Sequence, residues 1–322
     1  MAAPGTNCST RSPDDQSYEY YMFPSVSVVA LVFGLPGNLA ALFYFTARTG
    51  PRSAFGVYIA NLALTDLMIL CTLPFRIHYH LNGNDWVFGD AACRITGTLF
   101  HAGMYMSVCF MTCICVDRYM ATVHPHVYMK WRKVWCAVVA SASLWCVVGV
   151  AVLVFVLLGP LNTKPRESGG FSCFENFDQS EWESRLKGFS VFCLTFGSLV
   201  PSAIILVCYP AAARRIARIR TKMARKAVGV IYAILAITVL CLLPYHVVYL
   251  LHVLGHVKKI ESCATINGIH VARRVTIALA ILNTCLDPVL YYVTTGHCKW
   301  PWAKWFNKRV TRKRGVYVIS MI

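Results

Sequence analysis

The chain has 322 residues, 57% of them hydrophobic and only 14% charged, with a formal net charge of +17. Soluble domains carry roughly 25% charged residues, so this composition excludes an ordinary soluble protein and indicates a membrane protein. The positive charge alone would also suit nucleic-acid binding, so its distribution along the chain has to decide between the two.

The apolar residues are arranged in seven long runs. In chain order the runs cover residues 24–47, 54–81, 93–123, 134–158, 188–213, 227–254 and 271–294. About 20 apolar residues in a helix cross a bilayer, whereas barrel strands would give alternating segments of about 10 residues. The runs therefore predict an all-α membrane protein. Its seven-transmembrane helix bundle would cover residues 24–295, between an N-terminal segment (1–23) and a tail (296–322).

Basic side chains gather in the segments that share one side of this bundle. Examples are Arg214-Arg215, Arg225-Lys226 and Arg312-Lys313-Arg314, whereas the segments on the other side mix acids with bases. Because positively charged loops stay in the cytoplasm, the pattern predicts an extracellular N-terminus and basic loops against anionic inner-leaflet lipid. It favours multi-pass insertion in the plasma membrane and argues against a nucleic-acid partner.

Polar residues and prolines recur inside the apolar runs. In chain order they include Asn38, Asp66, Pro74, Asp117-Arg118-Tyr119, Trp145, Pro201, Tyr209, Pro244, Asp287-Pro288 and Tyr291. An acid and an arginine at the inner end of the third run are costly unless they pair or face water, so Asp117 and Arg118 are expected to pair. Their adjacency also suggests a switch, because movement of the helix can pass the arginine to another partner.

Fifteen cysteines are scattered without a repeated CxxC pair, which argues against a zinc site. Most lie within the runs, where they are expected to be reduced apolar fillers. Cys8, Cys93, Cys173 and Cys263 fall near the predicted outer face, and an even set in an oxidising compartment fits two disulfides. Asn7-Cys8-Ser9 on the same face is a glycosylation sequon, which makes Asn7 the expected acceptor.

Aromatic and basic residues interleave in the tail. Trp300, Trp302, Trp305 and Phe306 alternate with Lys299, Lys304 and Lys308, which predicts a short amphipathic helix at the inner leaflet. Cys298 beside it is either a palmitoylation site or an ordinary unmodified cysteine. The chain shows no serine elbow, zinc-binding helix or phosphate-binding glycine loop, so the sequence does not indicate an enzyme.

Taken in order, these motifs resemble those of the rhodopsin-like (class A) G-protein-coupled receptors over residues 24–306. Asp287 and Pro244-Tyr245-His246 are similar to the purinergic-receptor-like branch of that class. Two stretches resemble the lysophosphatidic acid receptors of that branch still more closely, namely Leu73-Pro74-Phe75-Arg76-Ile77 and Cys173-Phe174-Glu175-Asn176-Phe177. As departures, the usual aromatic residue is missing at Leu242, and Tyr249 replaces the base typical of the nucleotide receptors.

The resemblance implies a signalling role for the inner end of the bundle. The implied coupling and activation residues are Asp117, Arg118, Tyr119, Tyr209, Asp287, Pro288 and Tyr291, with a heterotrimeric G protein and arrestin as expected partners. Ala224 stands where some receptors carry an acid, so the inter-helix salt bridge to Arg118 is expected to be missing. The resemblance also implies the disulfide pairings Cys93–Cys173 and Cys8–Cys263.

A polar network is expected in the middle of the membrane, because a lone buried carboxylate there is very costly. Its implied members are Asn38, Asp66, Ser107, Asn283 and Asp287. This oxygen-rich set suits a sodium ion, as in related receptors, but a hydrogen-bond network of protein and water would need no ion. Both alternatives stay open, and no other metal or cofactor is expected.

A ligand pocket is expected to open outward between the spans. Its implied residues are Arg76, His101, Tyr105, Arg185, Tyr245, His246, Tyr249, Arg273 and Arg274. Arg76 follows Pro74 in the outer half of the second span, and its planar guanidinium suits a phosphate group. Arg94, which opens the third span, is a further candidate. For Arg94, Arg185, Arg273 and Arg274 the alternative to ligand binding is that each side chain reaches lipid headgroups or pairs with an outer acid.

A cationic rim over an aromatic interior suits an amphiphile with an anionic head and an acyl tail. The expected function is therefore a receptor that binds an extracellular anionic lipid, lysophosphatidic acid or a related lysophospholipid, and activates heterotrimeric G proteins. The alternatives are a proton-sensing receptor, suggested by the ten histidines, a nucleotide receptor, and a constitutively active receptor of the same branch.

Overall fold

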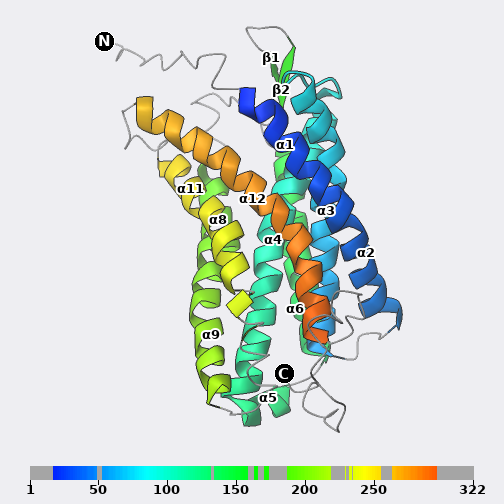
Figure 1. The fold of residues 1–322 in the computed structure, drawn as a ribbon, viewed down its shortest axis with the longest axis vertical. Helices are drawn as coiled ribbons and strands as arrows, with labels where there is room; N and C mark the ends of the chain where they lie inside the picture. Colours follow the sequence, from blue (N-terminus) through cyan, green and yellow to red (C-terminus); the bar gives the residue numbers. More distant parts are fainter. Residues whose placement is uncertain are drawn as a thin grey trace, which may run out of the picture.

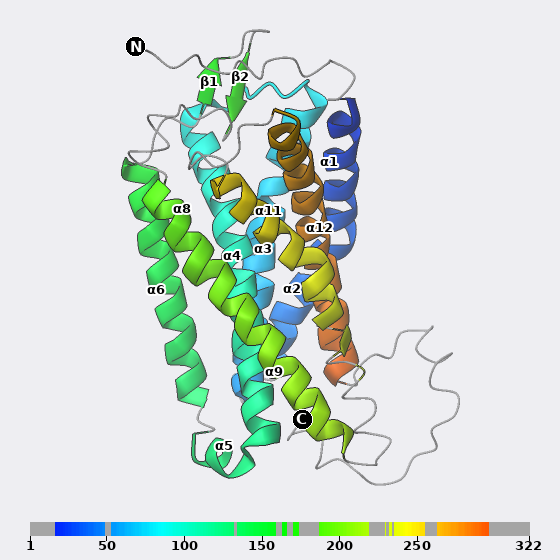
Figure 2. The same cartoon turned by 90° about the vertical axis from the view of Figure 1, so that its left-hand side faces the viewer.

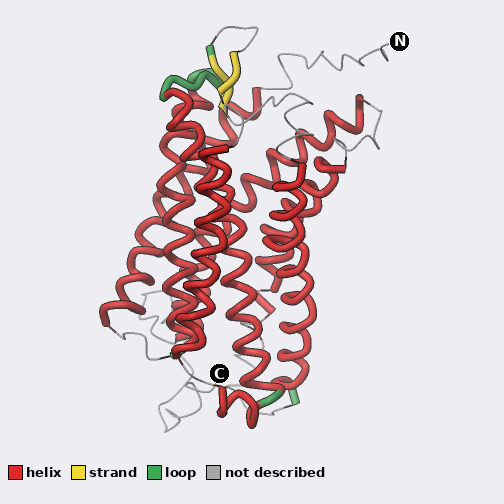
Figure 3. Tube along the Cα trace, turned by 180° about the vertical axis from the view of Figure 1, so that it is seen from behind, coloured by secondary structure: helices red, strands yellow, loops and turns green. Residues whose placement is uncertain are grey.

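The computed structural model describes residues 17–48, 53–131, 134–158, 163–165, 170–173, 187–218, 229, 232–233, 235–254 and 263–295. Most of these residues are helical, and one short strand pair lies at an end of the bundle (Figures 1 and 3). Several predicted features fall outside the described residues: Asn7, Cys8, Arg185, Ala224, Cys298, the tail helix, and the side chains of Cys263 and Tyr291.

The described elements follow the predicted runs closely. In chain order they are α1 (Ser17–Val29), η2 (Ala30–Gly34), α2 (Leu35–Phe43), η3 (Tyr44–Arg48), α3 (Ala54–Leu81), α4 (Gly89–Val123), α5 (Pro125–Trp131), α6 (Val134–Leu158), β1 (Thr163–Pro165), β2 (Phe171–Cys173), α8 (Lys187–Leu194), η5 (Thr195–Leu199), α9 (Val200–Ala217), η6 (Thr238–Leu242), α11 (Leu243–Leu254) and α12 (Cys263–Thr295). Among the described residues, six helices are long and apolar enough to cross a membrane, and α12 is a further long helix.

The bounds of α3 match the predicted run, whereas α4 begins earlier than its apolar run does. The extra turn of α4 contains Asp90, an acid in the first turn of a helix. A negative charge there is stabilised by the partial positive charge of the helix N-terminus, so the helix extends beyond its apolar part. Apolar content alone therefore underestimates the length of this helix.

Three of the long helices contain a π-helical turn just before a proline. The turns η2, η5 and η6 each end two residues before one, at Pro36, Pro201 and Pro244 respectively. A proline ring has no N–H to donate and collides with the preceding turn, so the regular hydrogen-bond ladder cannot continue through it. The prolines therefore account for the π-helical turns in these three helices.

Helix α4 runs through the middle of the bundle, in contact with α3, α6 and α9 (Figures 1 and 2). Its buried side chains include Phe100, Met106 and Phe110, which are fully enclosed. Helix α6, by contrast, leaves Val150 61% exposed and Leu157 68% exposed. Apolar surface of this extent is costly in water but is the natural contact for lipid.

A polar contact near the middle of helix α6 joins it to the bundle. Trp145 Nε1 donates a hydrogen bond of 2.8 Å to Asn61 Oδ1 on α3, and the ring of Trp145 lies beside Phe110 of α4. In hydrocarbon such a bond has no competing water, so it orients a helix whose outer surface is largely apolar.

Strands β1 and β2 form an antiparallel hairpin in the register Thr163↔Cys173. We call this end of the molecule the hairpin end, and the opposite end the Arg118 end. A disulfide joins Cys93, at the start of α4, to Cys173 with an S–S distance of 2.05 Å. The loop after α3 adds two hydrogen bonds of 2.8 Å, from Trp86 N–H to the Phe171 carbonyl and from Phe171 N–H to Asp85 Oδ1. The hairpin is thereby held over the ends of α3 and α4.

Candidate functional site

Two arginines on neighbouring helices lie near the hairpin end. Arg76 on α3 and Arg273 on α12 both lie within electrostatic range of His101 of α4 and of Tyr245 of α11. The guanidinium carbon of Arg76 lies 3.7 Å from the centroid of the Phe100 ring. A planar guanidinium can bind an anion such as a phosphate with two parallel hydrogen bonds.

Beneath the arginines lies a wall of aromatic side chains from α4 and α11. The rings of Tyr245 and Tyr249 are stacked with their centroids 6.1 Å apart, and those of Tyr105 and His246 are 6.2 Å apart. His246 is 1% exposed, and neither of its ring nitrogens has a hydrogen-bond partner among the described residues. Because an unsatisfied buried donor is costly, His246 marks a place where a ligand atom or a water would bind.

An apolar cluster adjoins this wall. It consists of Phe155, Leu194 and Val253, with Phe189, Tyr249 and Leu250 packed against them. Tyr249 belongs to both the cluster and the aromatic wall, so the surface passes continuously from polar rings to purely apolar side chains. The two arginines, the wall and the cluster therefore adjoin one another, with charged side chains at one end and apolar side chains at the other.

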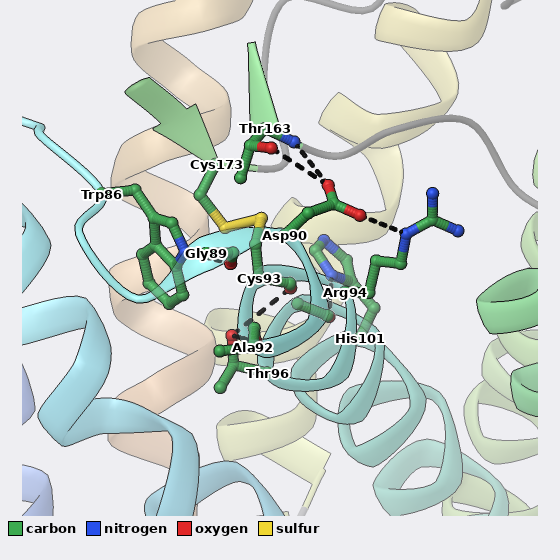
Figure 4. Close-up of a disulfide and its surroundings, with 11 residues drawn as sticks. Trp86, Gly89, Asp90, Ala92, Cys93, Arg94, Thr96, His101, Thr163 and Cys173 are labelled. Atoms are coloured by element: carbon green, nitrogen blue, oxygen red, sulfur yellow. Dashed lines mark hydrogen bonds and ion pairs between the residues drawn. A yellow bond between two sulfur atoms is a disulfide. The ribbon is translucent and has the colours of Figure 1, made fainter. Parts of the chain in front are cut away.

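The other arginines considered for the cationic rim have different surroundings from those of Arg76 and Arg273. Arg94 Nε forms an ion pair of 2.6 Å with Asp90 Oδ2, and its Nη1 donates to the Val156 carbonyl at 2.9 Å. Asp90 Oδ1 in turn accepts hydrogen bonds from Thr163 N and Oγ1, at 3.0 and 3.1 Å (Figure 4). Arg94 thus pairs with an acid at the hairpin end, and this acid anchors the hairpin. Arg274 is half-buried on α12, beside Arg273 in sequence.

The polar network predicted for the middle of the membrane is fully enclosed. Its members Asn38, Asp66, Ser107, Asn283 and Asp287 are each 0–1% exposed. Asn38 Nδ2 donates to the carbonyl oxygens of Gly34 and Thr284 at 2.9 and 2.8 Å, and Asn283 Nδ2 donates to Asp287 Oδ2 at 2.9 Å. The network thereby ties η2 to α12.

Several oxygens of this network lack a hydrogen-bond partner among the described residues. They include both carboxylate oxygens of Asp66 and the hydroxyl of Ser107. Asp66 and Asp287 are also close enough to interact directly. Two adjacent buried carboxyl groups cannot both carry a negative charge unless a cation neutralises them, and otherwise they share a proton. The unpartnered oxygens fit a hard cation such as sodium.

At the Arg118 end, Arg118 Nη2 and Asp117 Oδ2 form an ion pair of 3.1 Å. Tyr209 on α9 is fully buried and lies within electrostatic range of Arg118, and its hydroxyl has no hydrogen-bond partner among the described residues. Tyr119 is half-buried, and its ring lies 5.7 Å from that of His124. The buried Asp287-Pro288 pair lies on α12.

Two residues at this end were not found from the sequence. Tyr128 on α5 donates a hydrogen bond of 3.0 Å to Asp117 Oδ1. Phe55, in the first turn of α3, lies with its ring centroid 4.1 Å from the guanidinium carbon of Arg118. Neither belongs to a recognisable motif. The only sequence signal is their position next to the basic loops, which many other residues share.

Known proteins of one family match most of this chain. A sequence profile described as "7 transmembrane receptor (rhodopsin family)" matches residues 37–291. Lysophosphatidic acid receptor 6 of Gallus gallus is 33% identical over 307 residues, which cover 90% of this chain and 94% of the relative. The uracil nucleotide/cysteinyl leukotriene receptor of Homo sapiens is 34% identical over 294 residues, covering 90% of this chain and 77% of the relative. A purinoceptor of Meleagris gallopavo is 30% identical over 293 residues, covering 89% of this chain and 80% of the relative.

Proposed function

Because the chain belongs to the rhodopsin family of seven-transmembrane receptors, we propose that it binds an extracellular anionic lipid and activates a heterotrimeric G protein. The chain is a multi-pass membrane receptor of the lysophosphatidic acid and purinergic branch, not an enzyme. The proposal concerns its ligand, lysophosphatidic acid or a related lysophospholipid, and the direction in which the signal crosses the membrane.

The observation that carries the ligand proposal is that Arg76 and Arg273 both lie within electrostatic range of His101 and Tyr245. A phosphate monoester has enough oxygens to accept hydrogen bonds from two arginines at once. The apolar cluster around Leu194 and Val253 lies beside Tyr249, on the side where an acyl chain would continue.

A nucleotide is the second candidate ligand. One relative is named as a receptor for a uracil nucleotide, and it is as similar to the chain as the lysophosphatidic acid receptor is. The stacked rings of Tyr245 and Tyr249 would also accept a flat base. The apolar cluster favours the lipid, because the polar ribose and base of a nucleotide gain little from contact with Phe155 and Leu194.

The proposal also implies which end of the bundle faces the exterior of the cell. The hairpin end would face the exterior, where the Cys93–Cys173 disulfide is stable, and the Arg118 end would face the cytosol and the G protein. Arrestin would bind at the same cytosolic surface. Sodium bound between Asp66 and Asp287 would neutralise the two adjacent carboxyl groups; a hydrogen-bond network of protein and water, with one proton on the pair, is the alternative.

The test is a ligand panel with G-protein activation as the readout. Lysophosphatidic acid, the matching neutral monoacylglycerol, uridine nucleotides and buffers of decreasing pH are applied separately to cells that display the receptor at equal surface density. The lipid proposal expects a saturable response to lysophosphatidic acid and none to the neutral lipid. A saturable response to nucleotides alone would establish the second candidate instead, and a response to acid alone would overturn both.

A further inference from the structure

The restraint on Arg118 is built differently from a salt bridge between helices. Residues 214–228, which join the fifth and sixth spans, contain no acid, so they offer Arg118 no carboxylate. The described contacts of its guanidinium are with Asp117 on the same helix and with Phe55 on α3. Within the described part of the chain, the direct restraint on this arginine therefore comes from α3 and α4.

Phe55 is well placed to hold a cation. Ser53 caps the start of α3 by accepting a hydrogen bond of 3.1 Å from Gly56 N–H, which fixes the turn that carries Phe55. The ring also packs against the hydrophobic core of the bundle. Arg118 is 16% exposed, so water screens the attraction between the guanidinium and the ring only in part. A cation over an aromatic face at 4.1 Å is within the range of a stabilising cation–π contact.

Tyr128 acts on the same arginine through Asp117. The two carboxylate oxygens of Asp117 have separate partners: Oδ1 accepts the Tyr128 hydroxyl proton, and Oδ2 faces Arg118. The hydrogen bond from α5 thus fixes the rotation of the carboxylate, and with it the direction in which Oδ2 points. Tyr128 also joins α5 to the end of α4, so movement of that loop helix is coupled to the ion pair.

The guanidinium is not fully satisfied by these contacts. Arg118 Nε is buried without a hydrogen-bond partner among the described residues. A ring face accepts no directed hydrogen bond at this nitrogen, so the arginine keeps a donor for another acceptor. The restraint is therefore strong enough to bias the position of Arg118 but weak enough for a partner protein to displace.

We propose that Phe55 is a positioning residue, whose ring face holds Arg118 inside the bundle in the absence of ligand, alongside the hydrogen bond from Tyr128 to Asp117. The inference rests on the part of the proposed function in which Arg118 acts on the G protein. It does not depend on the identity of the ligand, because the restraint operates when no ligand is bound.

The test measures nucleotide exchange on the G protein without ligand, per receptor at the cell surface. Phe55→Leu keeps an apolar side chain but removes the ring, and Tyr128→Phe keeps the ring but removes the hydrogen bond. Each is expected to raise basal exchange by about two- to tenfold, the factor that one such contact supplies in a two-state equilibrium. Phe55→Trp restores an aromatic face and should return basal exchange toward the wild-type level.

Phe45→Leu is the matched control. Phe45 is another partly buried phenylalanine at the same end, and it packs beside Gly56 rather than against Arg118. A second measurement follows the contact itself by nuclear magnetic resonance of the purified receptor. Phe55→Leu should shift the Nε–H signal of Arg118, which is assigned by its loss in Arg118→Lys, because the ring current of Phe55 acts on that group.

Unchanged basal exchange in Phe55→Leu, with normal surface expression, would overturn the proposal, as would an unmoved Arg118 signal. An equal rise in Phe45→Leu would also overturn it, because general loosening of this end would then be the cause. A receptor that ignores lysophosphatidic acid but shows higher basal exchange in both Phe55→Leu and Tyr128→Phe would support the restraint and contradict the lipid assignment. The two proposals can therefore fail separately.

Discussion

Replacing Arg76 by alanine should weaken the response to lysophosphatidic acid through the loss of a charged hydrogen-bond donor to the phosphate. A hydrogen bond to a charged group contributes about 1.5–3 kcal/mol, so the concentration for half-maximal response should rise by about 10- to 150-fold. The contact of Arg76 with Phe100 adds to this loss only if it holds the guanidinium ready for the ligand. Arg76→Lys keeps the charge but loses the planar fork, so an intermediate loss is expected.

The same prediction extends to a double-mutant cycle with Arg273. Because both arginines lie within electrostatic range of His101 and Tyr245, they are expected to contact one phosphate rather than two separate groups. The loss in the double variant should therefore be smaller than the product of the two single losses, with a coupling of about 0.5–3 kcal/mol. The assay is G-protein activation at matched surface expression, with binding of labelled lipid as a second readout.

Two results would refute this reasoning. A change of less than twofold in Arg76→Ala would show that the arginine is not a head-group ligand. Single losses that multiply without coupling would place Arg76 and Arg273 at independent sites. Any residual response to the neutral monoacylglycerol serves as the internal control, because a lipid without the phosphate should not distinguish the variants from the wild type.

Three further predictions follow from other contacts. Gly103→Ala would place a carbon 2.6 Å from Cγ1 of Ile69, so overpacking between α3 and α4 should cost about 1–3 kcal/mol of stability. The melting temperature of the purified receptor should fall accordingly. Gly149→Ala, whose added carbon meets nothing within 4 Å, is the control and should leave the melting temperature unchanged. Asp90→Ala should cost about 1–2 kcal/mol locally and speed hydrogen exchange at the Thr163 amide, and equal exchange in the variant would contradict the anchoring role. If sodium occupies the polar network, Asp66→Asn should abolish an effect of sodium on ligand binding, and an effect that persists in the variant would place the ion elsewhere.

The bundle itself could be predicted from the sequence, because crossing a bilayer imposes a minimum length and apolarity on each helix. The run at 54–81 coincides with α3, and the place of Asp117-Arg118 at the end of α4 follows from its position in the third run. The Cys93–Cys173 pairing came from the resemblance to known receptors, and the structure contains it. The start of α4 was misjudged because a charged first turn is invisible to hydropathy.

Contacts between helices were decided only by the tertiary structure. Arg94 pairs with Asp90 one turn earlier in α4, as one of the alternatives left open by the sequence expected, but its hydrogen bond to the Val156 carbonyl of α6 comes from packing between helices. Asn38 reaches the carbonyl of Thr284, 246 positions away, and Phe55 reaches Arg118. In lipid both faces of a helix are apolar, so composition fixes that a helix spans the membrane but not which face turns inward. The rotation and tilt of each helix are set by close packing against its neighbours. This rotation and tilt decide which buried polar groups come into contact.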